Sequence, residues 1–161
     1  MFDLINGVPI HALIVHAAIV LIPLSAVGAI LIAARPKALR LFGAATVIGA
    51  TVGVVASVIS KTSGQNLAQR VGWPQEHVDY GNIFPIAALA FLLLLVVFWF
   101  IARGVPLNRN RPLWLKVFGA ALIVVAVGIT YLTVLTGFSG ASATWTRTME
   151  NTQPGTFTST E

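Results

Sequence analysis

The sequence predicts an all-α integral membrane protein, a bundle of four transmembrane helices. Of its 161 residues, 57% are hydrophobic and 9% are charged, whereas a soluble domain carries about 25% charged residues. Four apolar segments each match the roughly 20 residues that a helix needs to cross a bilayer. None of them alternates apolar and polar residues with a period of two, which is the pattern of a transmembrane β-barrel strand.

The predicted spans follow one another along most of the chain. The first contains His11 and His16 and stops at Arg35-Pro36. No Lys or Arg precedes it, and it is longer than the apolar core of about 7–15 residues in a signal peptide, so we interpret it as a mature span. The four ranges are Val8–Ala34, Leu41–Ile59, Ile83–Ala102 and Leu113–Leu135.

The basic residues predict the orientation, because Lys and Arg close to the spans stay on the cytoplasmic side. The first and third connections hold seven basic residues and no acidic ones, namely Arg35, Lys37, Arg40, Arg103, Arg109, Arg111 and Lys116. The other side carries three basic and five acidic residues. Both termini are therefore expected outside. The basic residues are interpreted as topology signals, with lipid-headgroup contact as the alternative and no nucleic-acid partner.

Two polar stretches lie on the predicted outer side. Residues 60–82 contain Leu67 and Val71 four residues apart and Trp73 as an interface anchor, so we expect a short amphipathic helix on the membrane surface. Residues 139–161 contain ten Ser or Thr and are expected to form a flexible tail. The chain then divides into a four-helix domain, residues 1–138, and a polar outward tail, residues 139–161. No internal repeat stands out between the two halves.

A stripe of small residues in the second span lets another helix approach closely. Its members recur at four-residue intervals and are Ala45, Gly49, Gly53 and Ser57. We expect them to pack inside the bundle, and the alternative is an interface with a partner.

All three histidines of the chain fall on the predicted outer side. Counting back from the cytoplasmic ends of their helices places His11 and His77 about 35 and 38 Å away, at one level, and His16 about 27 Å away. His11 and His16 are five residues apart, so they face different directions and do not converge on one zinc ion. His11 with His77 fits in depth as the two axial ligands of a haem b held between helices, while His16 with His77 would need tilt or an irregular start to the third span.

Other interpretations stay open at this point. The histidines could cap helix ends or hydrogen-bond to Asp79, Asn82 or free carbonyls, and a quinone-linked or proton-linked role is also consistent with them. The chain has no cysteine, no phosphate-binding glycine loop and no nucleophile elbow. Its spans contain no Asp, Glu, Lys or Arg, so they lack the buried charges of an ion-coupled transporter. We therefore expect neither an enzyme nor a transporter.

Motifs at three points of the chain carry a family resemblance. They are Gly7-Val8-Pro9-Ile10-His11 followed by Val15-His16, the segment from His77 to Gly81-Asn82, and Ser139-Gly140-Ala141 with Trp145. Together they resemble the domain-of-unknown-function 2231 family of bacterial membrane proteins, over nearly the whole chain. Members often carry a His or Asp just before the closing Ser-Gly, where this chain has Phe138. The resemblance implies four spans in the bacterial cytoplasmic (inner) membrane and an outward His cluster, but no established reaction.

These features predict a small non-catalytic accessory or assembly subunit of a larger membrane complex of the respiratory type. Its small size, uncharged spans, glycine stripe and outward tail all favour this interpretation. Its partners would be the lipid bilayer and other membrane protein subunits. The alternative is a b-type haem-binding electron-transfer protein with bis-His ligation.

Overall fold

The computed structural model describes residues 4–5, 7–150 and 152 of the chain. A two-stranded antiparallel hairpin, β1 (Leu4–Ile5) and β2 (Val8–Pro9), precedes the helices, with Leu4 opposite Pro9. Gly7 between these strands has a φ of 81°, in the left-handed region that favours glycine. The helices are α1 (Ile10–Ala34), α2 (Pro36–Val71), α3 (Gln75–Arg103) and α4 (Leu113–Glu150).

All four helices are long and apolar enough to cross a bilayer, as the sequence predicts. Large apolar side chains cover their outer surfaces; Leu24 is 63% exposed, Leu41 74% and Ile86 70%. Exposing so much apolar surface to water would be costly, whereas hydrocarbon accepts it. The fold is therefore that of an integral membrane protein.

Helices α2 and α4 extend beyond the apolar segments predicted as spans. Helix α2 continues to Val71 and ends where Gly72 adopts a φ of 101°, so residues 60–71 prolong α2 and do not form a separate surface helix. Helix α4 continues through residues 139–150, which the sequence-based expectation placed in a flexible tail. Hydroxyl groups there bond back to their own helix, as Thr144 does to the Gly140 carbonyl at 3.0 Å. Residues 153–161 of the expected tail lie outside the described residues.

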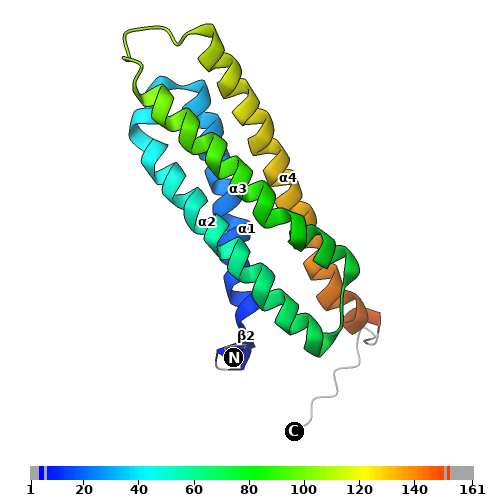
Figure 1. Cartoon of the computed structure of the whole chain (residues 1–161). Coiled ribbons are helices and arrows are strands. Elements are labelled where there is room, and N and C mark those ends of the chain that lie inside the picture. Colours follow the sequence, from blue (N-terminus) through cyan, green and yellow to red (C-terminus); the bar gives the residue numbers. More distant parts are fainter. Residues whose placement is uncertain (1–3, 6, 151, 153–161) are drawn as a thin grey trace.

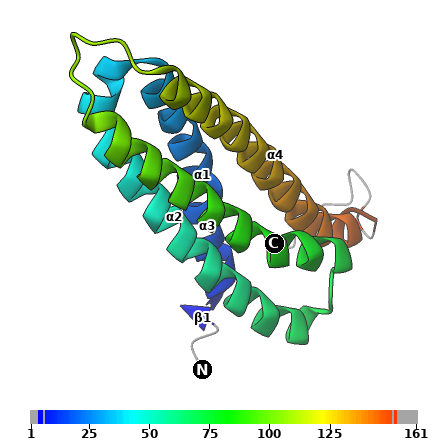
Figure 2. The same ribbon diagram turned by 45° about the horizontal axis from the view of Figure 1, so that its top comes forward.

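The helices form a bundle in which α1 and α3 lie on one diagonal and α2 and α4 on the other. Helices α1 and α3 each pack against both α2 and α4, but scarcely touch each other. Helix α1 begins and α4 ends at the same end of the bundle (Figures 1 and 2). The largest fully buried side chains fill the centre, among them Ile22, Ile32, Phe91, Phe98 and Leu122.

In the two helical hairpins, α1–α2 and α3–α4, the second helices share a sequence repeat, contrary to the expectation of no repeat. Residues 35–64 align without a gap with residues 111–140, and eleven of the thirty positions are identical. The shared residues include an Arg-Pro pair at the start, a Phe-Gly-Ala-Ala run at 42–45 and 118–121, and a Ser-Gly pair at 63–64 and 139–140.

Burial follows the same register in both hairpins. Seven buried positions of α2 have buried equivalents 76 residues later in α4; they are Leu39, Gly43, Thr46, Ala50, Gly53, Ser57 and Ser60. Five of the six buried residues of α1 have buried equivalents in α3 with a shift of 66, as Ile22 does in Ala88 and Ile32 in Phe98. The shifts differ because Arg35 alone joins α1 to α2, whereas residues 104–112 join α3 to α4. Since the hairpins run in the same direction, an approximate two-fold axis along the bundle relates them.

The end opposite the termini carries all seven residues expected to determine topology, in the two short connections and the helix ends beside them. Arg111 closes this end by donating from its guanidinium to the carbonyls of Ile32, at 3.0 Å, and Ala33. These carbonyls belong to the last turn of α1 and have no partner within that helix. Burial lowers the pKa of Arg111, yet a guanidinium stays charged at neutral pH and favours a helix C-terminus.

Candidate functional site

The structure brings His11 and His77 together at the end of the bundle where α1 and α3 begin. Their ring centroids are 6.1 Å apart and their planes are inclined at 78°. Each histidine lies in the first turn of its helix, and these helices share a diagonal, so the two rings meet near the two-fold axis. The equal depth predicted from helix lengths is consistent with this pairing.

A neighbouring helix anchors each ring. The Nδ1–H of His11 donates to the carbonyl of Ser60 in α2 at 2.9 Å, and that of His77 donates to the carbonyl of Thr136 in α4 at 3.1 Å. Ser60 and Thr136 are equivalent positions of the repeat. Because a carbonyl only accepts, the hydrogen must sit on Nδ1, and Nε2 of the neutral ring keeps its lone pair. Within the described residues, no hydrogen bond engages Nε2 of either ring.

Two glycines allow the rings to reach these carbonyls. A methyl group on Gly64 would lie 2.9 Å from Cε1 of His11, and one on Gly140 would lie 2.9 Å from Cε1 of His77. Each glycine follows the acceptor residue by four positions, and a side chain there would lie over the turn that carries the carbonyl. Gly140 belongs to the Ser139-Gly140-Ala141 motif of the family resemblance, but neither glycine was predicted to contact a histidine. Their signal is the Ser/Thr-x-x-Ser-Gly pattern that recurs at residues 60–64 and 136–140.

Several buried hydroxyl groups of α2 and α4 donate their hydrogens to carbonyls of their own helices. Ser57 donates to the Val54 carbonyl at 2.7 Å, and Thr133 to that of Ile129 at 2.7 Å. Thr136 and Ser139 likewise donate to backbone carbonyls of α4. The hydroxyl of Ser139, whose oxygen lies 3.1 Å from Nδ1 of His77, therefore offers that ring a lone pair rather than a hydrogen.

Other residues that the sequence singled out lie elsewhere. His16 is not part of the pair; its ring is exposed and donates from Nδ1 to the Ala12 carbonyl of its own helix. Asp79 accepts a hydrogen bond from Gln75 at 2.9 Å, whereas His11 and His77 bond to groups of α2 and α4. Among the residues that the structure describes, no group of three or more His, Cys, Asp or Glu could hold a metal ion.

The small-residue stripe of α2 faces α1 over most of its length. A methyl group on Gly49 would lie 2.9 Å from the Ser25 hydroxyl, and one on Gly53 would lie 2.7 Å from Cδ1 of Ile22. Ser57 is buried as well, whereas Ala45, nearest the basic end, is exposed. The glycines thus bring α1 and α2 close together inside the bundle.

The fold and the site together define a class of small four-span membrane proteins, built from two helical hairpins, with two imidazoles paired at one end. Residues 7–153 match the family described as "Predicted membrane protein (DUF2231)", and the chain belongs to this family. No curated protein and no solved structure gives a significant match. The family description names no reaction, so function has to be argued from the site.

Replacing either of the two glycines should weaken the fold. Gly64→Ala and Gly140→Ala are each expected to lower the free energy of unfolding by about 1–3 kcal/mol, because the imidazole must leave a well-packed position. Gly137→Ala is the matched control in α4, because a methyl group there meets nothing within 4 Å; it should be neutral or stabilising by up to about 1 kcal/mol. Thermal unfolding in detergent, followed by circular dichroism, measures all three, and equal midpoints would contradict this account.

Proposed function

We propose that the protein is a membrane-embedded electron-transfer protein that binds a b-type haem, with His11 and His77 as its axial ligands. The observation that carries the proposal is the pair of imidazoles, each with Nδ1 anchored to a backbone carbonyl and Nε2 free of hydrogen bonds in the described residues. Metal-ligating histidines typically donate their other ring N–H in this way, which fixes the tautomer and orients the ring.

The spacing and number of the ligands fit a haem better than a bare metal ion. Two imidazoles on opposite sides of an iron, with bonds of about 2 Å, hold their centroids roughly 6 Å apart, and the observed separation is 6.1 Å. A structural zinc ion takes four protein ligands, and the described residues supply only two here. A porphyrin brings the other four donors of a six-coordinate iron itself.

In this proposal the chain positions the ligands and the haem supplies one-electron chemistry when bound. Ser60 and Thr136 hold the hydrogen on Nδ1, so that Nε2 of each ring is available as a ligand. Gly64 and Gly140 let the rings lie against α2 and α4. Phe84 and Ala88 are buried in α3, about two and three turns after His77, and would keep water out of the bundle centre.

An absorption spectrum of the purified protein, expressed with adequate haem, tests the proposal. A Soret band is expected for the wild type and should be lost in His11→Ala and in His77→Ala, because each substitution removes one axial ligand. His16→Ala is the matched control and should keep the band, since this ring lies outside the pair. A wild-type spectrum without a Soret band would refute the haem proposal.

We place the site on the outer side of a bacterial cytoplasmic membrane, with both termini outside. The seven basic residues at the opposite end support this orientation, because such residues stay cytoplasmic. The sequence contains no cysteine, so a single introduced cysteine supplies the thiol that is labelled.

Single cysteines should report this orientation in intact cells. Gln75→Cys, exposed at the start of α3, is expected to react with a membrane-impermeant maleimide added outside. Arg109→Cys, exposed in the connection from α3 to α4, should react only after the cells are permeabilised. The opposite labelling pattern would reverse the proposed topology.

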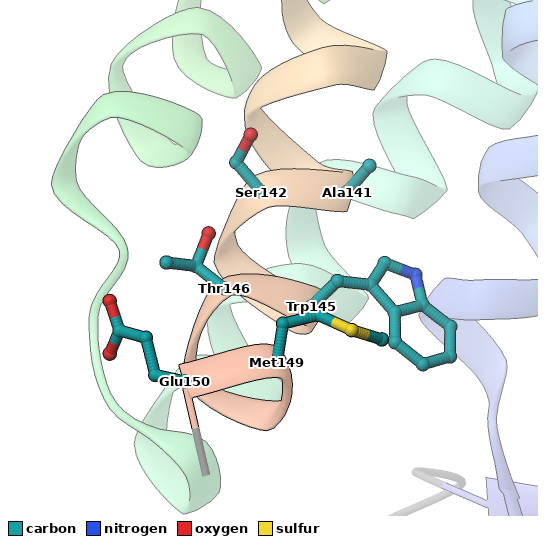
Figure 3. Close-up of a pocket in the computed structure, with 6 residues that line it drawn as sticks. All are labelled: Ala141, Ser142, Trp145, Thr146, Met149 and Glu150. Carbon is teal, nitrogen blue, oxygen red and sulfur yellow. The ribbon is translucent and has the colours of Figure 1, made fainter. Parts of the chain in front are cut away.

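A role as an accessory subunit of a larger, respiratory-type membrane complex is a second proposal, and the outer end of α4 favours it. A shallow groove of about 570 Å³ is lined there by six residues, Ala141, Ser142, Trp145, Thr146, Met149 and Glu150. Trp145 is 57% and Met149 60% exposed, and the two side chains lie together on one side of the helix (Figure 3). Trp145 and Met149 lie near the end of α4, which runs from Leu113 to Glu150 and is much longer than the roughly 20 residues that cross the hydrocarbon. Lipid would therefore cover this apolar face only in part, and a partner subunit would cover the rest.

Purification from native membranes in a mild detergent tests this second role. Wild-type protein should bring a defined set of subunits with it, and the double substitution Trp145→Ala with Met149→Ala should release them. Phe138→Ala is the control, because this side chain is 71% exposed but lies within the span. Recovery of the wild type only as a monomer or a self-dimer would contradict an accessory role.

A further inference from the structure

The surroundings of the two paired imidazoles differ in the hydroxyl group beside each ring. Nδ1 of His77 lies 3.1 Å from the hydroxyl oxygen of Ser139, in addition to its bond to the Thr136 carbonyl. The hydroxyl beside His11 belongs to Ser60, and its oxygen lies 3.4 Å from Nδ1. The contact to His77 is therefore the closer of the two.

The direction of the contact to His77 follows from the other bond that Ser139 makes. Its hydroxyl donates to the Thr136 carbonyl at 3.0 Å, so its hydrogen is already used. The oxygen then accepts from the Nδ1–H of His77, which is shared between two acceptors of α4. Ser139 is only 4% exposed, so water does not compete for this bond.

The repeat provides a natural comparison. Ser63 of α2 is the equivalent of Ser139, but its hydroxyl donates to the carbonyls of Ile59, at 2.9 Å, and Ser60, at 3.1 Å. No hydrogen bond joins Ser63 to His11 in the part of the chain described. The same residue type at the same position of the repeat thus contacts the imidazole in one half only.

We propose that Ser139 is a positioning residue that raises the basicity of His77 as a haem ligand and so lowers the reduction potential of the bound haem. This inference rests on the haem ligation proposed above. An acceptor on the second ring nitrogen raises the basicity of a ligating imidazole and fixes its orientation. A more basic ligand stabilises the ferric state relative to the ferrous state, and such hydrogen bonds are one of the means by which a protein sets a haem potential.

The midpoint potential of the purified holoprotein, measured by spectroelectrochemical titration, tests the inference. Ser139→Ala should shift the potential upward, because His77 loses an acceptor. Ser60→Ala should shift it less in the same direction, since that contact is longer. Ser63→Ala is the matched control: it removes a hydroxyl that donates to the Ser60 carbonyl but, within the described residues, hydrogen-bonds to neither ring, so it should not shift the potential upward.

Two further substitutions separate hydrogen bonding from folding. Ser139→Thr keeps the hydroxyl and should keep the wild-type potential. Ser139→Cys keeps the approximate size of the side chain, but its sulfur is a poor hydrogen-bond acceptor, so the potential should shift upward. This variant tests the inference even if Ser139→Ala fails to fold. An unchanged potential in Ser139→Cys, or an equal shift in Ser63→Ala, would overturn the role of Ser139 and leave the haem ligation standing. A wild type without a haem spectrum would instead overturn the proposed function, before any titration.

Discussion

The absence of water in the bilayer core is the constraint on which the rest of this structure depends, because polar groups there must find partners within the protein. Helices satisfy the backbone, and hydroxyls such as those of Ser57 and Thr133 bond to carbonyls of their own helices. In the described part of the chain no buried side-chain nitrogen or oxygen lacks a partner. The paired imidazoles follow the same rule, because Nδ1 of each ring bonds to a carbonyl of a neighbouring helix.

Each of the two helical hairpins contributes one histidine to the pair, His11 from α1–α2 and His77 from α3–α4. Each hairpin carries an imidazole at the start of its first helix, and a carbonyl acceptor and a glycine near the outer end of its second. A two-fold axis along the bundle then brings the two rings together without any further ligand. The two hairpins differ in the contacts of the equivalent residues Ser63 and Ser139. They also differ at the outer end of α4, where Trp145 occupies the position of Gln69 in α2.

The sequence could predict the spans and the shared level of His11 and His77, but not the full length of the helices. Hydropathy predicts which residues contact lipid. Helices α2 and α4 continue beyond those apolar segments, because the helical backbone hydrogen bonds continue there. Gly64 and Gly140 look like helix breakers in a sequence, yet each is held in a helix against an imidazole. The repeat was visible in principle, but the two connections differ in length, so the first and second helices of each hairpin align with different shifts.

The sequence by itself determined the four spans and the separation of basic residues from histidines, because the partition of a side chain between water and hydrocarbon is a property of that residue and its neighbours. The tertiary structure alone decided that His11 pairs with His77 and that His16 does not. Those outcomes depend on how each helix is rotated about its axis, and that rotation is set by packing between helices. The bonds that anchor the rings join residues 49 and 59 positions apart, and no local pattern in the sequence fixes contacts over such separations.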